Sequence, residues 1–166
     1  MTRSFMVGAA ALAFTVSGAL AQDLMVPVGE GPFNWDSYQA FADATDMSGE
    51  DLTIFGPWLA GEAAAFENLV AYFNAATGAG ATYVGSDSLE QQIVIDAEAG
   101  SAPNLTVFPQ PGLARNLAAR GFLEPLPADL ADWTRENMAA GQSWVDLGTY
   151  ANADGQDEFY GFFFNV

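Results

Sequence analysis

Three short segments rich in glycine and proline hold the side chains best suited to bind a polar ligand. The first, residues 56–62, reads GPWLAGE and combines the flat apolar ring of Trp58 with the carboxylate of Glu62. An indole ring suits the C–H face of a sugar, and a carboxylate accepts charge-assisted hydrogen bonds from neighbouring hydroxyl groups. Two plainer roles stay open: Trp58 packs on the domain surface, and Glu62 is an acid favoured by the helix dipole.

The second and third segments add further polar groups. Residues 85–88 read GSDS and offer a carboxylate with two hydroxyl groups. Asp87 stands three residues before Glu90, the spacing of a helix capping box, so capping competes with ligand binding for this carboxylate. The amide of Gln110 lies between two prolines, although Pro111 also suits the start of a helix. The candidate ligand-binding residues are Trp58, Glu62, Ser86, Asp87 and Gln110.

Alternating strand and helix patterns place all three segments at one edge of a predicted parallel sheet. Short apolar runs predict strands at 51–55, 81–84 and 104–108. Helical spacing of apolar residues predicts helices at about 61–76 and 89–99, and a third after Pro111. This order indicates an α/β fold, and ligands of such sheets bind beyond the carboxyl ends of the strands.

The remaining elements are predicted from weaker patterns. A short helix is expected at 35–44, weak helical character at 133–144, a polar turn at 152–158 and an aromatic strand at 159–164. In the 61–76 helix, one apolar stripe is expected to face the core. Its members are Phe66, Leu69, Val70 and Phe73.

The composition excludes several kinds of chemistry. The 166 residues include no cysteine and no histidine, and 21 acids against 4 arginines give a net charge of −17. Thiol nucleophiles, zinc–thiolate sites and Ser-His-Asp triads are therefore absent. The acidic surface would repel phosphates, so nucleic acid is not an expected partner. We expect no cofactor and no metal, because the 152–158 turn lacks the full ligand alternation of a calcium loop.

The first 21 residues have the pattern of a cleaved secretory signal peptide. Arg3 and the amino terminus supply positive charge, residues 5–21 are uncharged, and Ala19 and Ala21 occupy the positions that signal peptidase reads. We expect cleavage after Ala21. No cysteine follows for attachment of a lipid, so the product is expected to be free in a bacterial periplasm.

Residues 51–126 resemble the N-terminal lobe of bacterial ABC-transporter extracellular solute-binding proteins, family 1. Within that family they are most similar to alpha-glucoside-binding proteins. The sequence pieces that carry the resemblance are TIFGPW at 53–58, GSDS at 85–88, EQQI at 90–93, APN at 102–104 and VFPQPG at 107–112. The end of the chain, FYGFFFNV at 159–166, is similar to the strand after which family members cross to their second lobe.

The resemblance implies a periplasmic-binding-protein-like lobe with a mainly parallel sheet flanked by helices. It divides the chain into the signal peptide at 1–21, a polar lead-in at 22–47 and the N-terminal lobe at 48–166. It implies a monomer whose two lobes close on an oligosaccharide, with alpha-glucosides as the subfamily's ligands, and then dock on an inner-membrane ABC permease. It matches the five candidate residues to the family's binding loops and adds Asn165. Family members are far longer, so the second lobe is expected to be absent from this chain.

Two other functions stay open at this point. The alternative is a secreted carbohydrate-active hydrolase that uses Glu62 and Asp87 as acid and base. A structural or interaction protein without a ligand is the third.

Overall fold

The computed structural model describes residues 24–163. The predicted signal peptide and Asn165 lie outside this range. No helix within the described range has the length and apolar character that a membrane span requires.

The central element is a three-stranded parallel sheet. Its strands are β1 (Asp51–Gly56), β2 (Gly80–Gly85) and β3 (Leu105–Thr106), in the order β2-β1-β3. β1 pairs with both neighbours, so that Ile54 lies opposite Tyr83 on one side and Leu105 on the other. The prediction of an α/β fold with a mainly parallel sheet is confirmed, although β3 is shorter than the expected strand at 104–108.

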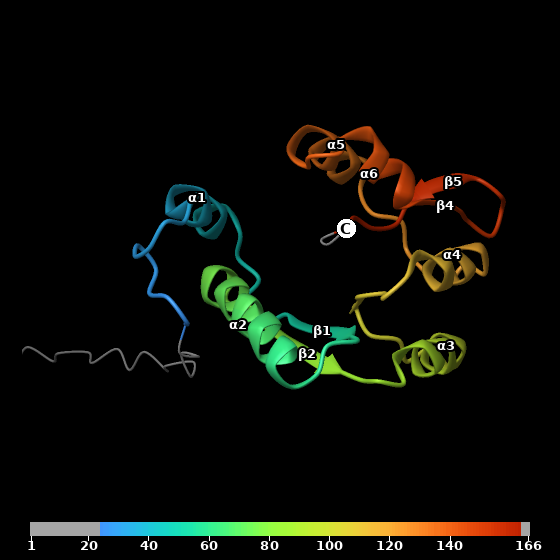
Figure 1. Cartoon of the computed structure of the whole chain (residues 1–166), viewed down its shortest axis with the longest axis horizontal. Helices are drawn as coiled ribbons and strands as arrows, with labels where there is room; N and C mark the ends of the chain where they lie inside the picture. Colours follow the sequence, from blue (N-terminus) through green and yellow to red (C-terminus); the bar gives the residue numbers. More distant parts are fainter. Residues whose placement is uncertain (1–23, 164–166) are drawn as a thin grey trace, which may run out of the picture.

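Helices cover both faces of this sheet (Figure 1). α2 (Ala60–Thr77) connects β1 to β2, and α3 (Leu89–Ala99) connects β2 to β3. The Asn74 side chain ties α2 to β2 by bonding both the N–H and the C=O of Ala81, each at 2.9 Å. Alternate residues of a strand point to opposite faces, so Tyr83 faces α2 while Phe55 faces α3.

The core is centred on Leu117 of α4 (Pro111–Ala119), which is fully buried. Leu117 packs in one cluster with Phe55, Leu89 and Ile93, so β1, α3 and α4 share a single apolar interior. A smaller cluster joins α4 to Tyr150 farther along the chain.

The remaining elements flank this unit. α1 (Trp35–Ala44) packs on α2, where the Tyr38 hydroxyl donates to the Tyr72 carbonyl at 3.1 Å. The C-terminal part contains α5 (Ala128–Asn137), α6 (Gln142–Leu147) and an antiparallel hairpin of β4 (Thr149–Ala151) and β5 (Asp157–Phe159).

The expected burial of the whole α2 stripe is wrong at one position. Val70 is buried, but the Leu69 side chain is 61% exposed. α2 contacts the sheet mainly through β2, and β3 pairs through only two residues. Within residues 24–163, the flank of α2 that carries Leu69 is therefore left uncovered.

The weak helical character expected at 133–144 is confirmed for most of this range, which is divided between α5 and α6. The break between them begins at the extended Met138 and includes Gly141, whose φ is +50°. The expectation of an aromatic strand at 159–164 is wrong over the described residues 160–163, because β5 ends at Phe159. The expected turn at 152–158 includes the start of β5. The Asn152 side chain accepts hydrogen bonds from the N–H groups of Asp154 and Gln156, which closes a tighter turn and forms a hairpin. Phe162, which follows β5 in this aromatic run, is 49% exposed.

Candidate functional site

The three predicted segments follow the carboxyl ends of β1, β2 and β3, at one edge of the sheet. The first two are in direct contact, because the N–H of Ser86 donates to the C=O of Gly56 at 3.0 Å. The third is linked to the start of α3 by a 3.4 Å hydrogen bond from the Gln110 amide to Glu90. The structure therefore brings the loops of Trp58, Asp87 and Gln110 to one region of the molecule.

Trp58 is half-buried in a small aromatic cluster at the start of this region. Its ring centroid lies 4.7 Å from that of Phe66 on α2 and 6.0 Å from that of Tyr83 on β2. The predicted packing role is thus real. It is compatible with ligand stacking, because part of the residue remains accessible to solvent.

The backbone of Trp58 is held as closely as its ring. Its N–H donates to the Tyr83 hydroxyl at 2.8 Å, and that hydroxyl donates to the Trp58 C=O at 3.1 Å. The loop also lies directly on the end of β2, since a Cβ atom at Gly85 would be 2.0 Å from the Trp58 carbonyl oxygen. No sequence motif indicated a role for Tyr83 in the site, because in the sequence it is only an aromatic residue of the expected strand at 81–84.

Ionisation of the Tyr83 hydroxyl should destabilise the folded chain at alkaline pH. Burial is the main cause that raises the pKa of Tyr83 above its ordinary value of 10.0; the bond with Trp58 opposes this, and Glu67 and Glu62 add to it. A group whose pKa is raised by folding contributes fully to the free energy of unfolding below the unfolded-state pKa, here about pH 10. That contribution is lost as the pH rises through the folded-state pKa. In an alkaline titration, the phenolate absorbance that the wild type gains and a Tyr83→Phe variant does not is the signal of Tyr83. We expect this signal to develop above pH 10, together with loss of tertiary circular dichroism. Ionisation of Tyr83 at or below pH 10 would contradict this.

Glu62 lies in the first turn of α2 and is exposed. This position agrees with the plainer role of an acid at a helix N-terminus. It also places the carboxylate one helical turn from Trp58, near enough to the Tyr83 phenol to influence it electrostatically. Glu62 therefore lies near the aromatic cluster that contains Trp58 and Tyr83.

The prediction that Asp87 caps α3 is wrong. The residue at the N-cap position is Ser88, and no side chain caps the helix. Because Ser88 is the N-cap, Glu90 is the second residue of α3, whereas a capping box needs the third. The exposed Asp87 carboxylate instead accepts a 3.0 Å hydrogen bond from the Ser88 hydroxyl.

Ser86 and Gln110 complete the described part of the site. The Ser86 hydroxyl oxygen accepts a hydrogen bond from the Ser88 N–H at 3.1 Å, so its own proton can still be donated to a ligand. Gln110 is exposed and precedes the first turn of α4 in an extended conformation. Its position before Pro111 confirms the predicted helix start.

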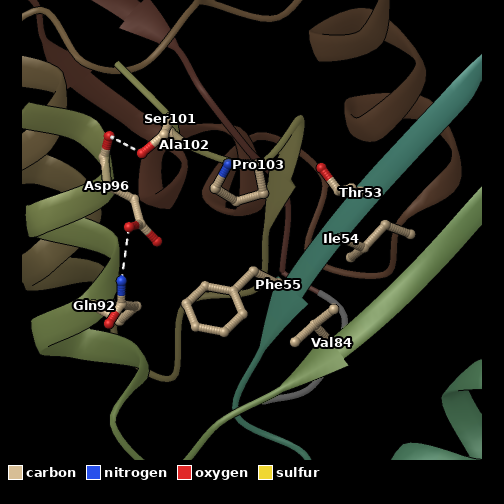
Figure 2. A pocket seen from close by; sticks show the side chains of 9 residues that line it. All are labelled: Thr53, Ile54, Phe55, Val84, Gln92, Asp96, Ser101, Ala102 and Pro103. Carbon is tan, nitrogen blue, oxygen red and sulfur yellow. Dashed lines mark hydrogen bonds between the residues drawn. The ribbon is translucent and has the colours of Figure 1, made fainter. Parts of the chain in front are cut away.

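A hollow of about 350 Å³ lies between α3, β1 and the 101–103 segment (Figure 2). Its floor is apolar, with Phe55 at the centre, and Gln92 and Asp96 of α3 border it, joined by a 2.7 Å hydrogen bond. The residues that line it are Thr53, Ile54, Phe55, Val84, Gln92, Asp96, Ser101, Ala102 and Pro103. None of the predicted site residues is among them.

Comparison with known proteins identifies the class of protein that the chain resembles. No protein-family profile matches the chain. Over its whole length, however, the chain is 44% identical across 173 aligned positions to the alpha-glucosides-binding periplasmic protein AglE of Rhizobium meliloti. The predicted resemblance to periplasmic solute-binding proteins is confirmed.

A second relative supports the same class of protein. The chain is 36% identical over 104 residues, or 61% of its length, to the osmoprotective compounds-binding protein GgtB of Synechocystis sp.. Both relatives are named as binding proteins and not as enzymes. The chain spans 38% of the length of AglE, and the match to GgtB covers 24% of that protein.

Proposed function

We propose that this chain is the N-terminal lobe of the periplasmic substrate-binding component of an ABC importer for sugars, with alpha-glucosides as the ligand. The observation that carries the proposal is the similarity of this whole chain to 38% of AglE, a protein whose name states this ligand class. The placement at one sheet edge of the loops that carry an aromatic ring, two carboxylates and an amide agrees with it, because a sugar offers both apolar faces and hydroxyl groups. A second lobe would close over the ligand, and the closed protein would dock on an inner-membrane permease.

In the proposed complex, the accessible part of Trp58 stacks on a glucose ring. Glu62 and Asp87 accept hydrogen bonds from sugar hydroxyl groups, and charge assistance strengthens these bonds. Ser86, Gln110 and Asn165 supply further polar contacts. None of these steps breaks a covalent bond, so the site recognises its ligand without catalysis.

The proposal includes the organisation of the chain. Residues 1–21 are a signal peptide that directs the protein to the periplasm, residues 22–47 lead into the lobe, and residues 48–166 form it. The protein acts as a monomer and needs no cofactor or metal. The complete protein consists of this chain together with the proposed second lobe.

Trp58→Ala in the complete protein should weaken the binding of maltose, an alpha-glucoside, by about 1–3 kcal/mol, because an aromatic stacking surface is lost. Isothermal titration calorimetry measures the change. Trp133→Ala is the matched control: it removes an indole that is 52% exposed on α5 and should leave the affinity unchanged. Wild-type affinity in Trp58→Ala would show that Trp58 only packs. Hydrolysis of the bound glucoside by the wild-type protein would contradict the importer role and favour the hydrolase.

A further inference from the structure

We propose that Tyr83 is a positioning residue of the sugar site: its hydroxyl fixes the loop that carries Trp58 and so places the indole for stacking. This inference rests on the proposed function, in which Trp58 contacts the ligand. Tyr83 itself is 9% exposed and acts from the β2 side of the sheet, through the loop that follows β1.

The hydroxyl group of Tyr83 holds both backbone polar groups of one residue. It accepts from the Trp58 N–H at 2.8 Å and donates to the Trp58 C=O at 3.1 Å. Two bonds to the same residue restrain both its position and its rotation about the chain direction. Trp58 lies between the end of β1 and the start of α2, where the regular hydrogen bonding of those elements does not extend.

The ring of Tyr83 supports the same loop. Its centroid lies 5.0 Å from that of Phe66, which in turn lies 4.7 Å from Trp58, so the three rings pack as a closed group. Glycine at position 56 allows Tyr83 to pack against the end of β1, because a Cβ atom there would lie 2.8 Å from both the ring and the oxygen of Tyr83. The glycine before Pro57 thus has a steric reason in addition to any role in a turn.

The chemistry of the contact requires a neutral phenol. Only the protonated hydroxyl can donate to the Trp58 carbonyl while it accepts from the Trp58 N–H. Burial raises the pKa of Tyr83, so the group keeps this dual role throughout the neutral range. The restraint therefore does not change with pH under ordinary conditions.

The test is a double-mutant cycle in the complete protein with maltose as the probe. Tyr83→Phe keeps the ring and removes the hydroxyl, and we expect about a tenfold loss of affinity, the order of one or two hydrogen bonds. In a Trp58→Ala background, the same substitution should change the affinity by less than about twofold, because the residue being positioned no longer has its indole. A merely structural role of Tyr83 would give the same loss in both backgrounds and would overturn the proposal.

Tyr72→Phe is the matched control. The Tyr72 hydroxyl also bonds both the N–H and the C=O of a single residue, Val26, but on the lead-in segment away from the three loops. Its removal should leave the maltose affinity unchanged. Amide hydrogen exchange of Trp58 should become faster in Tyr83→Phe and stay as in the wild type in Tyr72→Phe.

The possible failures can be told apart. If Trp58→Ala weakens binding and Tyr83→Phe does not, the positioning role is wrong while the proposed function stands. If both variants bind maltose as the wild type does, the proposed role of Trp58 fails, and the role of Tyr83 fails with it.

Discussion

Gly85→Ala should lower the stability of the chain by about 1–3 kcal/mol, the usual cost of forcing extra atoms into a packed site. The added Cβ would lie 2.0 Å from the Trp58 carbonyl oxygen. Because the opposing atom belongs to the backbone, the clash is relieved only if the loop after β1 moves away from β2. The hydrogen bonds between Tyr83 and Trp58 would then lengthen, so maltose affinity in the complete protein should fall as well. Urea unfolding of the full chain measures the first effect and calorimetry the second.

Gly61→Ala is the control for Gly85→Ala. Gly61 is in the first turn of α2, and an added Cβ there meets nothing within 4 Å. Alanine is favoured over glycine in a helix by about 1 kcal/mol, so this variant should be unchanged or slightly more stable. Equal stability of the two variants would show that the close approach of the loop to β2 does not exist in solution.

Leu117→Ala should have the largest effect on stability, a loss of about 2–5 kcal/mol. Leu117 is fully buried where α3, α4 and β1 meet, in one cluster with Phe55, Leu89 and Ile93. Truncation removes apolar contacts with all three elements and leaves a cavity. Since small domains are stable by only about 5–15 kcal/mol, much of the folded population would be lost at modest urea concentrations.

The matched control is Leu69→Ala, which makes the same chemical change at a side chain that is 61% exposed. It should alter the stability by less than about 0.5 kcal/mol. A comparable loss in both variants would mean that Leu69 is covered in the folded protein and that the described arrangement of α2 is incomplete. The comparison therefore tests the corrected burial pattern of α2 as well as the core.

The elements around the site could be predicted because each has a strong local signal. Glycines in the left-handed conformation end two of the helices, at Gly78 and Gly100, and a proline starts α4. Apolar strands between such helices admit few arrangements other than a parallel sheet. Once the sheet is parallel, the three polar loops must share one edge, which is why the candidate site followed from the sequence.

The failures have separate physical origins, one in a contact between distant segments and two in local side-chain hydrogen bonds. The two bonds of Tyr83 to Trp58 depend on the register of β1 and β2, which no local pattern specifies. The capping role of Asp87 was wrong because its carboxylate is bonded by the Ser88 hydroxyl instead of by a helix N–H. The β4–β5 hairpin was missed because its strands are three residues each and its turn is closed by the side chain of Asn152.

The central claim is that the loops at the carboxyl edge of the sheet bind an alpha-glucoside. Hydrogen-exchange mass spectrometry of the complete protein, with maltose and with the β-linked cellobiose as control, tests it most directly. We predict that maltose slows exchange in peptides that cover residues 56–62, 85–88 and 109–112, and that cellobiose has a much weaker effect. Protection by maltose confined to the hollow lined by Thr53, Gln92 and Pro103, or no protection in any of the three loops, would contradict the claim.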